Sequence, residues 1–228
     1  MPNLDLTPSL VEELDAKPAQ DVLAWALGKL HPRIAFAWSG AEDVVVLDLM
    51  LKVRADARVF TLDTGRLNPE TYDVMERVRE KYGLKLEVMF PRHDRVETMV
   101  RGKGLNLFYA SVENRKECCG ARKVEPLGRA LADLDGWVTG LRRDQAVTRT
   151  TLHKVEIDAG NRGILKVNPI ADWSHEQVWA YIKANGVPYN TLHDKGYPSI
   201  GCAPCTRAVE KGEDIRAGRW WWENPETK

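Results

Sequence analysis

Four cysteines in two close pairs are the residues best suited to carry chemistry. Cys118 and Cys119 are adjacent, and Cys202 and Cys205 form a C-x-x-C pair. Thiols paired twice in this way indicate metal coordination in a reducing compartment, because inert buried cysteines rarely pair up twice. Zinc and a 4Fe-4S cluster are both bound by four thiolates. A redox-active dithiol at Cys202 and Cys205 is a weaker interpretation, since nothing around it resembles the start of a thioredoxin βαβ unit.

The adjacent pair favours the cluster over zinc. Side chains of neighbouring residues on a helix point about 100° apart, which suits the coordination of one small ion poorly. A 4Fe-4S cluster presents four separate iron corners and accepts such a pair more readily. We therefore predict a 4Fe-4S cluster with four metal ligands: Cys118, Cys119, Cys202 and Cys205.

Arginines gather at two places in the sequence. One group follows directly behind a predicted strand and consists of Arg142, Arg143 and Arg149. The second lies beside the last cysteines and consists of Arg207, Arg216 and Arg219. Because the guanidinium group is a rigid, permanently charged donor fork, arginine suits phosphate or sulfate. For the first group, the position behind a strand favours anion binding over the alternative, a solvated charged face. For the second group both interpretations stay open.

Short apolar runs alternate with amphipathic segments along most of the chain. We expect strands at 34–38, 58–62, 85–89 and 137–139, and a hairpin from 152–157 and 164–167. Helices are expected after Thr7 and at 18–30, 44–51, 69–82, 96–103, 118–132 and 174–184. This alternation predicts an α/β domain with right-handed crossovers.

Three loops leave the carboxyl ends of the predicted strands, where open α/β sheets bind ligands. They are Ser39-Gly40-Ala41-Glu42-Asp43, Asp63-Thr64-Gly65-Arg66 and Gly140-Leu141-Arg142-Arg143-Asp144. In the first loop, a glycine allows close backbone approach, and the following helix offers free N–H groups to an anion. A tight turn capped by Asp43 is the alternative. The loop is not a P-loop, because the Gly-Lys-Ser/Thr ending is absent.

Composition and charge bound the class of protein. The 228 residues include 33 basic and 33 acidic side chains, so the formal net charge is zero. This balance is ordinary for a globular protein and lacks the whole-protein signature of a nucleic-acid or membrane binder. Because no secretory signal or membrane-spanning run is seen, we expect a cytoplasmic protein with reduced thiols and neither nucleic acid nor membrane as partner. Its oligomeric state is open, a homo-oligomer included.

Seven motifs follow one another in order from about residue 34 to the last residues. They are Ser39-Gly40-Ala41-Glu42-Asp43, Leu62-Asp63-Thr64-Gly65-Arg66, Cys118-Cys119-Gly120 with Lys123-Val124-Glu125-Pro126-Leu127, Thr139-Gly140-Leu141-Arg142-Arg143-Asp144-Gln145, Lys166-Val167-Asn168-Pro169, the run from Gly196 to Thr206, and Arg216-Ala217-Gly218-Arg219-Trp220-Trp221-Trp222-Glu223. In this order they resemble the assimilatory sulfonucleotide reductases, specifically the iron-sulfur adenylyl-sulfate (APS) reductases.

The resemblance implies an adenine nucleotide α-hydrolase-like fold, a mainly parallel sheet flanked by helices. It implies one domain over 1–228, with a nucleotide-binding core over 34–170 and an irregular appendage over 196–228. The implied reaction is reduction of APS to sulfite and AMP with thioredoxin as electron donor. The implied substrate-binding residues are Ser39, Gly40, Asp43, Leu62, Asp63, Thr64, Gly65, Gly140, Arg142 and Arg143. The implied catalytic cations are Lys123, Arg216 and Arg219, and the four cysteines would hold the cluster.

Members of this family attack the sulfur with a cysteine in a short carboxy-terminal Glu-Cys-Gly-Leu-His segment. The enzyme S-sulfocysteine formed there is then released as sulfite by thioredoxin. The four cysteines of this chain are all assigned to the cluster. We therefore expect the nucleophile to lie beyond Lys228, and the chain of 228 residues to be inactive without it.

Three alternatives to this function are carried forward. The first is reduction of the 3'-phosphorylated substrate, PAPS; relatives that prefer it generally lack both cysteine pairs, so the presence of both favours APS. The second is a pyrophosphatase-loop nucleotidyl-transferase, which is discounted because Gly40-Ala41-Glu42 replaces the expected Gly-Gly. The third is a non-catalytic nucleotide or iron-sulfur binding module. For Trp220 to Trp222, we expect core packing rather than a docking surface.

Overall fold

Six strands form a mixed, mostly parallel sheet in the computed structural model, which describes residues 6–145 and 151–224. The strand order is β3-β2-β1-β4-β6-β5. The strands are β1 (Ile34–Trp38), β2 (Arg58–Leu62), β3 (Glu87–Met89), β4 (Gly136–Val138), β5 (Val155–Asp158) and β6 (Ile164–Val167). Strand β1 pairs in parallel with β2 and β4, and β6 pairs in parallel with β4. Strands β5 and β6 form the expected antiparallel pair, so the α/β prediction is confirmed.

Eight α-helices are described: α1 (Pro8–Asp15), α2 (Ala19–Leu30), α3 (Val44–Val53), α4 (Pro69–Tyr82), α5 (His93–Lys103), α6 (Val112–Cys119), α7 (Glu125–Leu131) and α8 (His175–Ala184). Two predicted caps are present, because the Thr7 hydroxyl accepts from the Leu10 N–H and Ser174 forms a capping box with Gln177.

The helix predicted at 118–132 has different bounds in the structure. It begins earlier, at Val112, because the Ser111 hydroxyl accepts a hydrogen bond from the Asn114 N–H and so caps the first turn. Residues Gly120–Val124 form a π-helical turn between α6 and α7. Helix α6 is rich in charged residues and has no clear apolar stripe, so its periodicity does not reveal where it starts.

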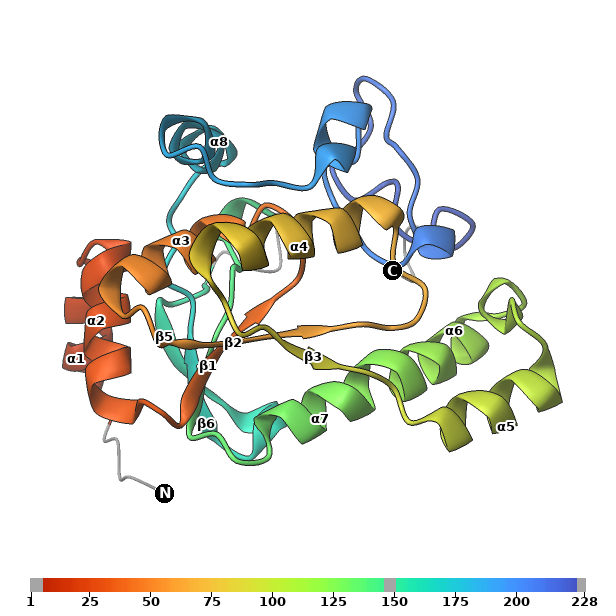
Figure 1. Ribbon diagram of the computed structural model, residues 1–228, viewed down its shortest axis with the longest axis horizontal. Helices are drawn as coiled ribbons and strands as arrows, with labels where there is room; N and C mark the ends of the chain where they lie inside the picture. Colours follow the sequence, from red (N-terminus) through yellow and green to blue (C-terminus); the bar gives the residue numbers. More distant parts are fainter. Residues whose placement is uncertain (1–5, 146–150, 225–228) are drawn as a thin grey trace. The chain divides into compact units, whose positions relative to one another are not determined.

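The chain divides into two compact units. The first unit comprises 1–61, 76–87 and 131–189, and it contains helices α1, α2, α3 and α8 (Figure 1). In this unit α2 packs against α3, β1 and β6. Four of the five apolar side chains of β1 are buried, Ile34 and Phe36 completely, and Ala37 is half-buried, as expected for a strand covered on both faces.

The second unit comprises 62–75, 88–130 and 190–228. Figure 1 shows α5 and α6 as neighbouring helices of this unit. Its core contains Met99, Leu107, Phe108, Cys118 and Cys205, with Cys202, Trp220 and Trp222 packed against them. The expected packing of the tryptophans thus holds for two of them, whereas Trp221 is 49% exposed. The division into one domain with a core and an appendage stays a prediction.

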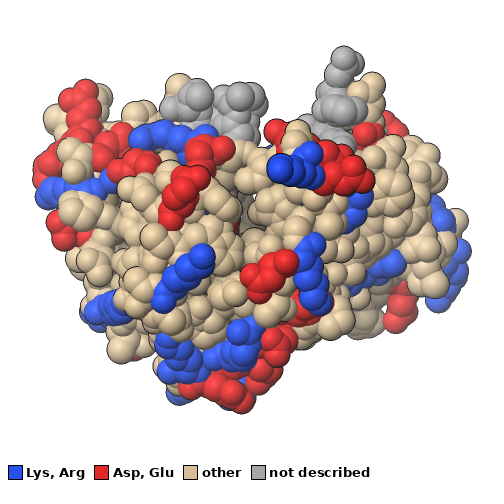
Figure 2. Space-filling model, turned by 90° about the horizontal axis from the view of Figure 1, so that it is seen from above, with Lys and Arg blue, Asp and Glu red and all other residues tan. Residues whose placement is uncertain are grey.

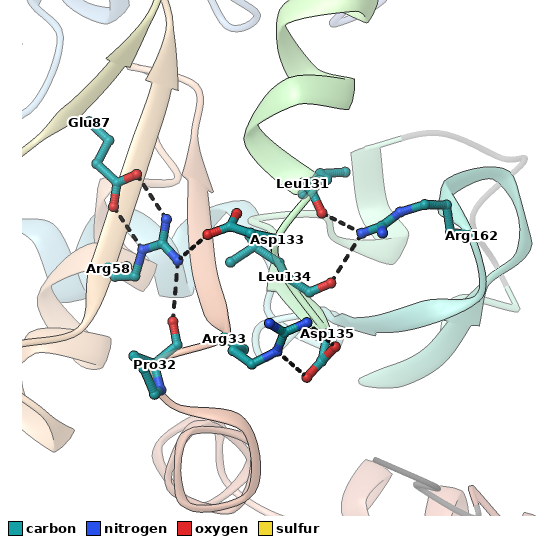
Figure 3. A network of polar contacts seen from close by, with 9 residues as sticks. All are labelled: Pro32, Arg33, Arg58, Glu87, Leu131, Asp133, Leu134, Asp135 and Arg162. Carbon is teal, nitrogen blue, oxygen red and sulfur yellow. Dashed lines mark hydrogen bonds and ion pairs between the residues drawn. The ribbon is translucent and has the colours of Figure 1, made fainter. Parts of the chain in front are cut away.

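A polar network lies at the amino ends of the strands in the first unit (Figure 3). Arg33 binds Asp135 through two hydrogen bonds of 2.6 and 2.9 Å. Arg58 binds Glu87 through bonds of 2.9 and 3.1 Å and also contacts Asp133. These side chains join the starts of neighbouring strands.

The surface drawn in Figure 2 shows acidic and basic side chains mixed with one another, in keeping with the zero formal net charge. Among the residues that the structure describes, no helix has the length and apolar character needed to cross a membrane.

Candidate functional site

The loop after β1 is organised around the Asp43 carboxylate. This carboxylate accepts hydrogen bonds from the Ser39 N–H at 2.7 Å, the Ser39 hydroxyl at 2.9 Å and the Ala41 N–H at 3.2 Å. Gly40 has a φ of 78°, a left-handed conformation that favours glycine. The loop is therefore closed on itself, and the donors of Ser39 and Ala41 that could face an anion point to Asp43.

Asp43 is expected to make stability depend on pH. Burial raises its pKa to about 6, from a reference value of 3.8, despite the hydrogen bonds from Ser39 and Ala41 that lower it. Because the folded pKa is the higher one, folding takes up a proton between these values, and the contribution of Asp43 to stability falls as pH rises through 6. Relative to Asp43→Asn, the wild-type chain should gain about 1 kcal/mol of unfolding free energy between pH 7.5 and pH 5. Denaturant titrations of both proteins at the two pH values measure this; a constant difference would contradict it.

Gly140 lies against this loop because β4 and β1 are neighbours in the sheet. A Cβ atom added to Gly140 would lie 2.3 Å from the Asp43 Cβ and 3.2 Å from its Cα. The contact explains the glycine without appeal to a ligand, and it brings the first and third predicted loops together.

Gly140→Ala should destabilise the fold, since the new methyl group must displace Asp43. We expect a loss of about 1–3 kcal/mol of unfolding free energy, as for other overpacked sites. Gly28→Ala is the control, because Gly28 lies inside helix α2 and nothing is within 4 Å of its added Cβ. That variant should gain about 0.5–1 kcal/mol from the better helix propensity of alanine. If urea titrations gave both variants the same unfolding free energy, the structure around Asp43 would accommodate the added methyl group without destabilisation.

Arg142, predicted to bind substrate, is completely buried. Its guanidinium lies 2.8 Å from the buried Glu42 carboxylate and 3.0 Å from Asp144. Arg143 donates to the Leu152 carbonyl at 2.8 Å. Glu42 is thus neutralised inside the protein instead of facing a ligand. Substrate binding by both arginines stays a prediction, and the packing of Arg142 favours a role in shaping the loop. Arg149 lies outside the described residues.

The loop after β2 contacts the thiols in the second unit. The Asp63 carboxylate accepts from the Gly65 N–H at 2.7 Å and from the Tyr72 hydroxyl at 3.0 Å. Burial and this bond to Asp63 raise the pKa of Tyr72 to about 12. The Thr64 hydroxyl lies 3.1 Å from the Cys202 Sγ, although the two residues are 138 positions apart. Leu62, at the end of β2, is half-buried.

The structure brings the four cysteines together. All four are free; Cys118 and Cys205 are buried, and Cys119 and Cys202 are half-buried. Burial, as the largest cause, raises the pKa of Cys118, of Cys119 and of Cys205, the last to about 12. The neighbouring thiols raise these pKa values further. Such an electrostatic effect links every pair of the four cysteines, so all four lie near one another. A metal centre bound here would have to displace protons from the thiols.

The three predicted catalytic cations also lie in the second unit, near the thiols. Much of the Lys123 side chain is exposed to solvent. The protein around it nevertheless lowers its pKa, chiefly by desolvation and then through the charge of Arg219. Burial and Arg216 likewise lower the pKa of Arg219. The Arg219 Nη1 donates to the Ile200 carbonyl at 3.1 Å. Its buried Nε has no hydrogen-bond partner in the part of the chain that the structure describes.

Sequence reasoning missed two further arginines at the thiols. Arg122 donates to the Thr64 carbonyl at 2.8 Å, and its charge acts against the raised pKa of Cys118. Arg115 forms a buried ion pair with Glu223. The spacing in the sequence could have placed both arginines near the thiols, since residues three or four positions from Cys118 share its face of a helix. Nothing in the sequence indicated the partners.

This architecture defines an α/β protein of the adenine nucleotide α-hydrolase-like class, with charged loops at the carboxyl ends of parallel strands. Residues 33–208 match the family model of the phosphoadenosine phosphosulfate reductase domain, and the chain belongs to this family. The resemblance to the sulfonucleotide reductases is thereby confirmed.

Two relatives are similar over most of the chain. Adenosine 5'-phosphosulfate reductase from Burkholderia cepacia is 53% identical over 98% of this chain and 88% of the relative. The protein of the same name from Allochromatium vinosum is 56% identical over 86% of this chain and 76% of the relative.

Solved structures support the same fold. A phosphoadenylyl-sulfate (PAPS) reductase from Candida auris, crystallised as a phosphate complex, superposes with a TM-score of 0.75 and 29% identity, covering 90% of this chain and 99% of that one. FMN adenylyltransferase from Candida glabrata has a TM-score of 0.57 at 15% identity, covering 96% of this chain and 83% of that one, and shares the fold alone.

Proposed function

We propose that this protein reduces APS to sulfite and AMP, with thioredoxin as electron donor. The observation that carries the proposal is the gathering of four thiols and three cations, Lys123, Arg216 and Arg219, within one unit of a chain of this family. The choice of APS over PAPS rests on the presence of both cysteine pairs and on the relatives that are 53% and 56% identical and carry the APS reductase name.

For the thiols we propose a 4Fe-4S cluster in preference to a zinc ion, because separate iron corners suit the adjacent pair Cys118 and Cys119 better than one small ion does. In the described residues, no group of three or more His, Cys, Asp or Glu side chains is arranged to hold a metal ion. The four thiols nevertheless lie near one another, as separate iron corners require. Cys118, Cys119, Cys202 and Cys205 would hold the cluster, which would supply a fixed charge near Lys123. Reduced thiols of this kind also support a cytoplasmic location.

Nucleotide binding is proposed for the predicted residues of the three loops, and sulfur transfer for the cations. A cysteine thiolate attacks the sulfur of APS, an S–S bond forms, and the bond from sulfur to the phosphate oxygen breaks, with its electron pair leaving on AMP. Lys123, Arg216 and Arg219 stabilise the charge that develops on that oxygen. Two thiols of thioredoxin then reduce the S-sulfocysteine, which releases sulfite and leaves thioredoxin as a disulfide. The nucleophile is a fifth cysteine outside residues 1–228, because the four in this chain are assigned to the cluster.

An assay of the complete reading frame, purified without oxygen, tests the proposal. With reduced thioredoxin we expect sulfite and AMP in equal amounts from APS, and much less from PAPS at the same concentration. The chain 1–228 is the matched control and should bind APS without forming sulfite. Binding without sulfite from the complete protein would favour the non-catalytic module, and a preference for PAPS would favour the PAPS reductase alternative.

A further inference from the structure

A buried ion pair joins helix α6 to the end of the described chain. The Arg115 Nε and Nη2 donate to the two carboxylate oxygens of Glu223 at 2.9 and 2.8 Å. The two side chains are only 10% and 3% exposed. A bidentate pair this well covered fixes both the distance and the orientation of its partners. It joins residues 108 positions apart, one of which lies three residues before Cys118.

The Trp220 ring lies within cation–π distance of two guanidinium groups. The Arg115 Cζ is 4.4 Å from the ring centroid, and the Arg219 Cζ is 5.2 Å from it. Contacts of this kind attract a cation to an aromatic face. Because Glu223 neutralises Arg115, the uncompensated charge in this arrangement is that of Arg219.

The backbone of Trp220 is held in an unfavourable conformation. Its φ of 46° is left-handed, which is rare for a bulky residue and persists only where the surroundings enforce it. The Trp220 N–H donates to the Cys205 carbonyl at 3.1 Å, and the Glu223 N–H donates to the Trp220 carbonyl at 2.8 Å. A flexible tail would relax this strain, so the position of the ring is imposed by its contacts.

Arg219 requires such support because it lies near other cations. Arg216 and Arg219 each lower the pKa of Lys123, and Arg216 lowers that of Arg219. The guanidinium also lies against Gly201, where an added Cβ would lie 2.5 Å from the Arg219 Nη2. Without a ligand, mutual repulsion would move these side chains apart toward water.

We propose that Arg115, Trp220 and Glu223 form a positioning stack that holds Arg219 ready for the anionic groups of the sulfonucleotide. This inference rests on the proposed function, because it takes the ligand of Arg219 to be APS. None of the three residues is assigned contact with substrate; they act through Arg219.

A double-mutant cycle on the cluster-loaded chain 1–228, which should bind APS without consuming it, tests the stack. Arg115→Lys keeps the charge but loses the flat fork that pairs with Glu223 and covers Trp220. Calorimetric titration with APS gives the Kd of the wild type, Arg115→Lys, Arg219→Ala and the double variant. Each single variant should bind about 10-fold more weakly, as expected for losing a charge-assisted bond. The double variant should bind no more weakly than Arg219→Ala, because the stack has no other route to the ligand.

The control is Lys103→Met, which breaks the exposed pair of Lys103 with Glu117 of the same helix α6 and should leave the Kd unchanged. If Arg115→Lys does not fold, Trp220→Leu takes its place in the cycle. The stack would be overturned if the fold-losses in affinity of the two single variants multiplied in the double variant. An unchanged Kd in Arg115→Lys would overturn it as well. A wild-type protein that does not bind APS would instead overturn the proposed function.

Discussion

Serine in place of any one of the four cysteines should remove the iron and acid-labile sulfide from the protein. We expect about four of each per chain in the anaerobically purified wild type and close to none in each variant, because one cluster needs all four thiolates. Cys118 and Cys205 are buried in one core and Cys202 packs against it. Cys119 lies near enough to raise the pKa of Cys205. Equal loss in all four variants would distinguish a shared cluster from two independent pairs. Iron, sulfide and zinc analysis together with visible absorption measures the effect.

Thr206→Ser is the matched control for the cysteine variants. Thr206 is buried next to Cys205, and its hydroxyl donates to the Cys202 carbonyl at 3.1 Å, a bond that serine can keep. This variant should retain its iron. The comparison distinguishes the loss of a cluster ligand from a small change of packing beside the thiols. A cysteine variant with full iron content, or stoichiometric zinc in the wild type, would refute the cluster assignment.

Lys123→Ala should lower kcat/KM by about 100- to 1000-fold in the complete enzyme, the effect typical of removing one group that stabilises charge in the transition state. The fold should not weaken, because desolvation and the charge of Arg219 already disfavour the protonated lysine, as its lowered pKa shows. For the same reason, the free enzyme should lose activity on the alkaline side below the ordinary lysine pKa of 10.5. Steady-state assays across pH and thermal unfolding of both proteins measure these effects.

Lys116→Ala provides the control for Lys123→Ala. Lys116 is an exposed lysine of helix α6, seven positions earlier in the chain, so its removal changes the net charge by the same amount. Its kcat/KM should stay close to that of the wild type. Unchanged turnover in Lys123→Ala would refute a catalytic role for Lys123. An equal loss in both variants would show that Lys123 acts only through the overall charge.

Most elements of the fold were predictable because their signals are local. The buried run of β1, the Thr7 cap and the capping box of Ser174 and Gln177 each depend on residues a few positions apart. The start of α6 was missed for a physical reason: Ser111 marks it, but the charged helix that follows has little apolar periodicity.

The sequence by itself determined which residue types are available for chemistry: two thiol pairs, loops at strand ends, and basic side chains near both. Only the tertiary structure decided how they are used. It buries Arg142 against Glu42, places Thr64 beside Cys202, and joins Arg115 to Glu223. Each of these contacts links residues far apart in the chain, and such pairs depend on how the elements pack, for which spacing along the sequence carries no signal.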